Sequence, residues 1–256
     1  MRSTAEPRSR ARLPPAGILF LGALLVVVPG GSLAVWMKVR AQRELIARIG
    51  FGGGNGVRSE GEFGGRWLRR RFNPAWLTGL DPIHRVAWRG PGANDETVAR
   101  LGICRHLHEL DLMNSEITDD GLVHLSGLTE LESLKLDATE VTARGLQHLK
   151  PLQRLRMLSL SATGVTDDGL ESLVDLSSLD TLNLHATDVS DEGLASIAKV
   201  RSLQWLSLGR TSITDEGLRR LSGMPVLKSL AVDSTEVTEE AVRAFEADNP
   251  GCHVSR

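Results

Sequence analysis

Apolar residues recur along most of the chain at a fixed interval of 24 residues. In one unit the recurring positions are Leu179, Leu182, Leu184 and Val189. The same four positions are apolar in seven consecutive units, starting with the unit that begins at Ile83, and no insertion or deletion breaks the register. A fixed period in the twenties is typical of a solenoid, in which each unit buries its apolar face only by stacking on its neighbours.

The apolar spacing changes partway through each unit. After the first leucine, apolar and polar residues alternate, as in a strand with one buried face. Leucines then recur every three residues behind a hydroxyl residue and two acids, which predicts a short helix with a hydroxyl N-cap and acids beside its positive end. A glycine that follows in most units, such as Gly193, is expected to let neighbouring backbones approach closely. The predicted N-caps are Thr118, Thr142, Thr166, Ser190, Thr214 and Thr238.

The unit L-x-x-L-x-L-x-x-T-x-[IV]-T-D-x-G-L-x-x-L-x-x-L resembles the leucine-rich repeats common in large planctomycete protein families. It is also similar to the cysteine-containing repeats of F-box-type leucine-rich proteins, with threonine where those carry Asn or Cys. The resemblance covers residues 83–250. It implies a right-handed α/β leucine-rich-repeat solenoid of seven repeats, curved, with a parallel sheet on the concave side and short helices on the convex side. It implies a binding role and no catalytic residues.

The N-terminal 37 residues have the pattern of a membrane or export segment. A basic tail, residues 1–12, precedes residues 13–37, which carry no charge and are long enough to span a bilayer as a helix. Two interpretations stay open, a transmembrane signal anchor and a cleaved signal peptide with Ser32-Leu33-Ala34 as its cleavage site. Basic residues flank both sides and do not orient the segment. Most signal anchors would leave the repeats outside the cytoplasm, so a single-pass membrane protein with extracytoplasmic repeats is expected, or an exported one after cleavage.

The segment between this hydrophobic stretch and the repeats has three parts. Residues 38–65 are predicted to form a juxtamembrane helix and a glycine-rich tether, which lacks the G-K-[ST] and G-x-G-x-x-G patterns of phosphate-binding loops. Residues 66–82 are predicted to cap the first repeat, and their arginines either form a solvated face or contact anionic lipid. This stretch also resembles planctomycete membrane-anchored proteins. Beyond the repeats, residues 251–256 form a tail in which one last short strand is expected.

Charge and cysteine content exclude some classes of function. The net charge of −2 offers no basic surface for nucleic acid. Cys104 occupies a core leucine position, and Cys252 lies past the last repeat. Stacked strands would separate the two by roughly 25 Å or more, so no disulfide is predicted.

No constellation of residues predicts catalysis or a cofactor. His84 and His108 share one repeat position, but no HExxH, CxxC or carboxylate-rich loop accompanies them, so no metal site is predicted. The acids at the helix starts are explained more simply by the helix dipole than by cation binding, and Ala143-Arg144 interrupts them. We therefore expect no enzyme, no cofactor and no small-molecule substrate.

The exposed face of the sheet is the best candidate for a binding site. It is formed by the residues two, four and six positions after each first leucine, which point away from the core. Most are small and polar, but an exposed Trp205 close to Met157 fits the composition of a binding hot spot. The alternative is a tryptophan lying flat over its neighbours without a partner. The predicted partner-binding residues are Trp205, Met157, His185, Arg210, Met113 and Asn183.

The sequence thus favours a membrane-tethered, non-catalytic module that binds a protein or peptide on the concave sheet. An F-box-type substrate-recognition adaptor in protein turnover is one alternative, although residues 50–82 are too short and glycine-rich for an F-box. A structural cell-envelope protein without a discrete ligand is the other, and a concave face that tolerates mutation would favour it.

Overall fold

The computed structural model describes residues 56–59 and 83–256. The chain divides after Met37, and all the described residues lie in the second unit, Lys38–Arg256. The predicted anchor and nearly all of the predicted tether and N-terminal cap lie outside these residues. Within the described ranges, no helix is long and apolar enough to cross a membrane.

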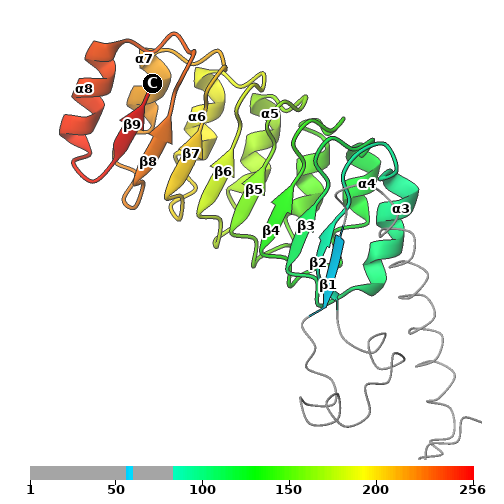
Figure 1. Ribbon diagram of the computed structural model, residues 1–256. Helices are drawn as coiled ribbons and strands as arrows, with labels where there is room; N and C mark the ends of the chain where they lie inside the picture. Colours follow the sequence, from blue (N-terminus) through cyan, green and yellow to red (C-terminus); the bar gives the residue numbers. More distant parts are fainter. Residues whose placement is uncertain (1–55, 60–82) are drawn as a thin grey trace, which may run out of the picture. The chain divides into compact units, whose positions relative to one another are not determined.

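In the described part of the chain, nine strands form one sheet in chain order (Figure 1). Strands β2 to β9 are parallel, and each residue pairs with the one 24 positions further on, as in Leu134 with Leu158. The period found in the sequence is therefore the register of the sheet. The strands are β1 (Gly56–Ser59), β2 (Ile83–Ala87), β3 (Glu109–Asp111), β4 (Ser133–Lys135), β5 (Met157–Ser159), β6 (Thr181–Asn183), β7 (Trp205–Ser207), β8 (Ser229–Ala231) and β9 (His253–Ser255).

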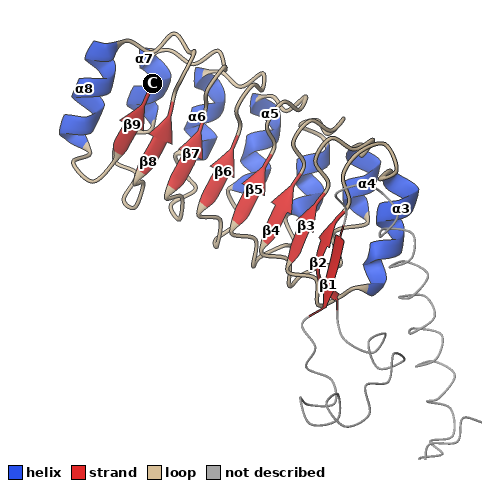
Figure 2. Ribbon diagram, in the orientation of Figure 1, coloured by secondary structure: helices blue, strands red, loops and turns tan. Residues whose placement is uncertain are grey.

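Short helices line the other side of the repeats and run alongside the sheet (Figure 2). They are α3 (Asp95–Ala99), η2 (Arg100–Ile103), α4 (Asp119–Val123), η3 (Gly145–Leu149), α5 (Asp167–Leu170), η4 (Glu171–Leu173), α6 (Asp191–Ile197), α7 (Asp215–Arg220) and α8 (Glu239–Asp248), where η marks a 3₁₀ helix. Sheet on one side and helices on the other confirm the predicted leucine-rich-repeat solenoid.

The core is a continuous layer of leucines between the sheet and the helices. The repeating leucines, such as Leu158, Leu160 and Leu170, are completely buried. Burial of one such side chain contributes about 1.5–3 kcal/mol. Cys104 joins this core as predicted, and burial raises the pKa of its thiol to about 11. Both cysteines are free.

A hydroxyl residue lies in the turn after each of strands β3 to β8, and it is buried after β3 to β7. Thr139, Thr163, Thr187 and Thr211 each donate to the carbonyl three residues earlier at 2.6–2.7 Å. This bond satisfies a carbonyl at the point where the backbone leaves the sheet, so it is buried at little cost. The threonine at the position where F-box-type repeats carry Asn or Cys thus makes a hydrogen bond within its own repeat.

A carboxylate joins most neighbouring repeats. Asp191, at the start of α6, accepts the backbone N–H of Thr214 at 2.8 Å and its hydroxyl at 2.7 Å. We call this contact the Asp–Thr bridge. Its acceptors are Asp95, Asp119, Asp167, Asp191 and Asp215, and its donors are Thr118, Thr142, Ser190, Thr214 and Thr238.

The helix glycines make room for this bridge. A Cβ on Gly217 would lie 2.2 Å from the Asp191 carboxylate, and one on Gly193 would lie 2.2 Å from that of Asp167. The expected close approach of backbones is therefore wrong at these positions, because the neighbour is a side chain. It holds at Gly169, where a Cβ would lie 2.7 Å from the Cα of Ala143.

The predicted hydroxyl N-caps are confirmed at Thr118, Ser190, Thr214 and Thr238. The prediction is wrong at Thr166, whose side chain makes no capping bond. At the sixth predicted cap, the hydroxyl of Thr142 accepts the N–H of Arg144 at 3.3 Å, but η3 begins only at Gly145. Both departures flank Ala143, where the bridging aspartate is missing.

The two ends of the sheet differ. Strand β1 pairs antiparallel with β2, so residues 56–59 are ordered as a strand where the sequence predicts part of a tether. At the other end, β9 confirms the last short strand expected in the tail. The Val254 N–H, which faces away from β8, donates to the Glu246 carboxylate of α8 at 3.0 Å. The final strand is thus closed off by a side chain of the chain itself.

Candidate functional site

The exposed face of the sheet carries a row of five residues in register, Ser133, Met157, Thr181, Trp205 and Ser229. We call it the Met–Trp row. Met157 and Trp205 are each 37% exposed and are the only exposed large apolar side chains in strands β2 to β9. The structure therefore places these two predicted site residues on one face, two strands apart.

Thr181 lies between them and is half-buried. Its hydroxyl donates to the Asp180 carboxylate at 2.8 Å, and Asp180 in turn pairs with Arg156 at 2.9 Å. Next to Trp205 and Ser229, Lys228 donates to the Gln204 side chain at 2.8 Å. Arg156 and Asp180 thus neutralise each other beside Thr181, and the five side chains of the Met–Trp row are themselves uncharged.

Asn183 lies two residues after Thr181 on β6 and belongs to a series of hydrogen-bonded side chains. It donates to the Ser159 hydroxyl at 3.1 Å, and Ser159 donates to the carboxylate of Asp137. The Asn183 side-chain oxygen also accepts the His185 N–H at 3.0 Å. Asn183 is therefore held in place by the protein and gives this part of the face a fixed polar pattern.

A histidine–carboxylate pair crosses the next strand. The Nδ1 of His185 lies 3.9 Å from Asp233, which belongs to the repeat after next. A Cβ on the intervening Gly209 would lie 2.6 Å from His185 Nδ1 and 2.4 Å from the Asp233 carboxylate. Gly209 thus makes room for the pair. The signal for this pair in the sequence was Gly209, the one glycine at a repeat position that otherwise holds larger residues.

The other two predicted site residues lie apart from the Met–Trp row. Arg210 is exposed on the turn after β7, with a left-handed φ of 55°. Met113 is half-buried and follows β3. The β3 residue in register with Met157 is Glu109, and Met113 lies four residues beyond it. From the strand geometry, Met113 and Met157 are separated by roughly 16 Å. Met113 and Met157 therefore form no common cluster.

The N-terminal part of the face is charged and internally paired. Arg85 pairs with Glu109 at 2.6 Å, and Arg89 pairs with Asp111. Burial raises the pKa of Asp111, but hydrogen bonds from Arg89 and from the Met113 N–H outweigh it, so the net pKa lies below its usual value. This part of the face offers no apolar contact of the kind formed by Trp205.

Three histidines gather at the starts of the first strands. The rings of His84 and His108 lie 4.9 Å apart, and His106 Nδ1 lies 3.0 Å from Glu130. The hydrogen bond from His106 lowers the pKa of Glu130. Across the described part of the chain, no group of three or more His, Cys, Asp or Glu residues is arranged to hold a metal ion.

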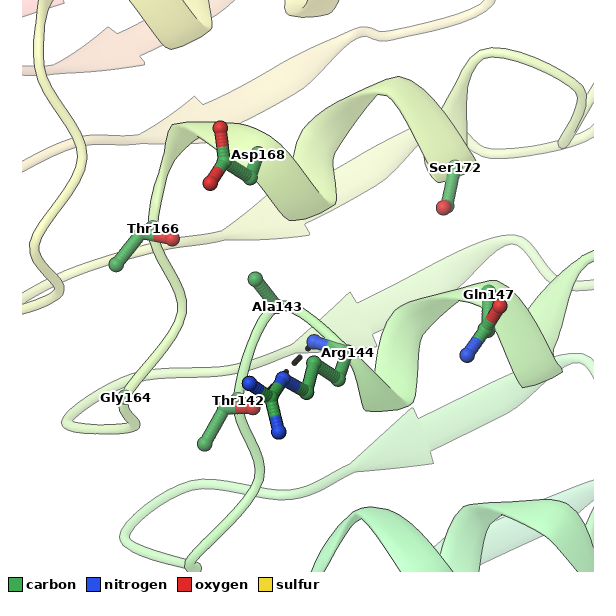
Figure 3. Close-up of a pocket in the computed structure, with 8 residues that line it drawn as sticks. All are labelled: Thr142, Ala143, Arg144, Gln147, Gly164, Thr166, Asp168 and Ser172. Atoms are coloured by element: carbon green, nitrogen blue, oxygen red, sulfur yellow. Dashed lines mark hydrogen bonds between the residues drawn. The ribbon is translucent and has the colours of Figure 1, made fainter.

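A polar crevice of about 490 Å³ opens where the Asp–Thr bridges are interrupted (Figure 3). Ala143 stands where five other repeats carry aspartate, and Thr166 faces it without a carboxylate partner. Arg144, Asp168 and small polar residues complete the lining. No charged group there is buried, so the crevice marks a gap in the bridge ladder and lacks the built-in ligands of a binding site.

Comparison with known proteins agrees with this fold. A family model described as Leucine Rich repeat matches residues 104–126. Internalin C2 from Listeria monocytogenes is similar in structure, with a TM-score of 0.57, 25% identity and coverage of 69% of this chain and 72% of that one. A second internalin from the same organism gives a TM-score of 0.47 and 18% identity over 62% of this chain and 50% of that one. No curated protein matches the sequence. The chain is a leucine-rich-repeat protein by its fold.

Proposed function

We propose that this protein is a membrane-tethered, non-catalytic interaction module that binds a protein or peptide on the concave face of its sheet. The observation that carries the proposal is the pair Met157 and Trp205, both exposed in the middle of a face of small polar residues. Tryptophan is strongly enriched among residues that dominate binding energy. Leucine-rich-repeat proteins in general bind proteins, and the similarity to internalin C2 supports the same use here.

The rigidity of the face also supports a binding role. Side chains around the two apolar residues are fixed by hydrogen bonds between neighbouring repeats, such as those of Asn183 and Asp180. A surface that is ordered before binding loses less conformational entropy when a partner docks. The same rigid scaffold would hold the two apolar residues at a constant separation.

Partner capture from native membranes tests this function. Wild-type protein and a Trp205→Ala/Met157→Ala variant are compared by cross-linking and pull-down. The matched control is Ile103→Ala/Val226→Ala, which removes two side chains that are 47% and 41% exposed but lie off the sheet face. Loss of the captured partner only in the first variant supports the proposal. Equal capture by all three, with all three folded by circular dichroism, rejects the concave face as the site.

The membrane tether is a separate part of the proposal. We place the anchor at residues 13–37, with the repeats outside the cytoplasm, because this stretch is uncharged and follows a basic tail. Carbonate extraction and protease digestion of intact cells test it. An anchored chain resists extraction and loses its repeats to external protease. A released chain whose measured mass lacks the N-terminal residues shows a cleaved signal peptide instead.

A further inference from the structure

The Met–Trp row has a spacing that selects among ligand conformations. Met157 and Trp205 occupy the same position on strands separated by one other strand. Two strand spacings amount to about 9.6 Å. A polyproline II helix repeats one face every three residues, or about 9.3 Å. An extended strand repeats a face every two residues, at about 6.7 Å, which does not match. An α-helix returns to a face after seven residues, at about 10.5 Å.

Hydrogen-bond donors on the row separate the two remaining conformations. Among the described residues, neither the indole N–H of Trp205 nor the hydroxyl of its neighbour Ser229 has a hydrogen-bond partner. An α-helix satisfies its own interior carbonyls and leaves such donors unused. A polyproline II segment has no internal hydrogen bonds, so its carbonyls are free to accept them. The free donors therefore favour polyproline II.

The charges around the row favour an uncharged ligand. Beside Thr181, at the centre of the row, Arg156 is paired with Asp180. A charged ligand side chain at this point would have to break that ion pair or stay unpaired. An apolar, proline-rich segment needs neither, and it is already ordered before binding.

We propose that the surface from Met157 to Trp205, with the half-buried Thr181 between them, binds a proline-rich segment of a partner in the polyproline II conformation. Apolar side chains three residues apart contact Met157 and Trp205, and a carbonyl of the segment accepts the Trp205 indole N–H. This inference rests on the proposed function, because it names the chemistry of the partner on the same face.

Binding of labelled peptides to the full chain, followed by fluorescence anisotropy, tests the inference. The probe is a peptide of four Pro-Pro-Leu units, which presents leucine on one face every three residues. One comparison peptide has four Gly-Gly-Leu units and lacks the preformed helix. The other is an Ala/Gln-based α-helix with leucines seven residues apart. We expect the Pro-Pro-Leu peptide to bind at least tenfold more tightly than either.

Variants of the protein separate spacing from composition. Trp205→Ala is expected to weaken binding of the Pro-Pro-Leu peptide by roughly thirtyfold, as for a tryptophan at a hot spot. Met157→Ser/Thr181→Met moves the methionine one strand closer to Trp205 and keeps the side chain on the face, and we expect about tenfold weaker binding. Ile103→Ala is the control and should leave the affinity unchanged.

Two results would overturn the inference. One is an α-helical or glycine-rich peptide that binds as tightly as the proline-rich one. The other is unchanged affinity in the variant with the moved methionine. If the proline-rich peptide fails to bind while partner capture still depends on Trp205 and Met157, this inference is wrong and the proposed function stands. If the peptide binds through Trp205 while native capture ignores both residues, the proposed function is wrong as stated.

Discussion

At the residue scale, six residues other than glycine adopt the same left-handed backbone conformation. Their φ angles lie between 52° and 56°, and each occupies the turn that follows a strand. An L-residue pays about 1–2 kcal/mol for this conformation. At five of the six turns the backbone N–H donates to the next repeat, as Ala162 does to the His185 carbonyl at 2.9 Å, so stacking holds the turn in place. The residues are Asn114, Ala138, Ala162, Ala186, Arg210 and Ser234.

Glycine at one of these turns should stabilise the protein. We expect Ala162→Gly to raise the free energy of unfolding by about 0.5–1 kcal/mol, because relief of backbone strain exceeds the entropy that glycine adds to the unfolded chain. Urea unfolding at constant pH measures it. The control is Ala195→Gly, another exposed alanine but inside α6, which should lose about 1 kcal/mol. Destabilisation by both substitutions would contradict the strain argument.

These turns show how far sequence reasoning reaches for single residues. The leucine pattern predicted the buried core of the repeats, since burial follows directly from the period, but not the buried Cys252 beyond them. It did not predict the left-handed turns, because alanine at three of them carries no preference for positive φ. The available signal was Gly90 in the first repeat and Asn114 in the second, at the same position in the period.

At the scale of the repeat element, the Asp–Thr bridge was missed although its residues were recognised. Acids at a helix start are expected from the helix dipole alone, so the pattern needed no further explanation. A finer signal was present, because the bridging position is aspartate wherever a bridge forms, whereas the next position is aspartate or glutamate. In the last repeat, which bridges to no further repeat, the bridging position is Glu239. A short carboxylate is needed to reach the next repeat.

Removal of one bridge should destabilise the array. Asp191→Ala leaves the N–H and hydroxyl of Thr214 without their acceptor, and hydrogen bonds to a charged group contribute about 1.5–3 kcal/mol. We expect a loss of about 2 kcal/mol in the free energy of unfolding, measured with urea. Glu192→Ala, at the exposed second acid, is the control and should cost less than 0.5 kcal/mol. Equal losses in both variants would mean that the helix dipole alone explains the acids.

The missing Asp–Thr bridge at Ala143 allows a test in which a bridge is added. Ala143→Asp places a carboxylate opposite Thr166 and should restore the missing bridge, with a gain of about 1 kcal/mol after the local backbone adjusts. The gain should vanish in Ala143→Asp/Thr166→Val, which keeps the charge and removes the hydroxyl donor. A double-mutant cycle from urea unfolding gives the coupling between the two positions. A coupling near zero would show that the close approach of Ala143 to Gly169 prevents the bridge.

At the scale of the whole molecule, the 24-residue period of the sequence predicted the register of the parallel sheet and the residues on its exposed face. It therefore predicted that Met157 and Trp205 lie on one face of the sheet. It could not predict the antiparallel strand β1, because Gly56–Ser59 lies outside the period and pairs in the opposite direction. The pair of His185 with Asp233 was also missed, since two residues 48 positions apart meet only because the side chain between them is absent.

The C-terminal end of the sheet yields the last prediction. The outward N–H of Val254 is occupied by Glu246, which keeps this edge from pairing with another strand. Glu246→Ala frees that N–H and removes the charge, so we expect mass-weighted light scattering to show concentration-dependent association that the wild type lacks. Glu240→Ala, an exposed acid at the start of the same helix, should behave as wild type. If Glu246→Ala shows the same mass as wild type at every concentration, the edge is closed by the shape of α8 rather than by this one carboxylate.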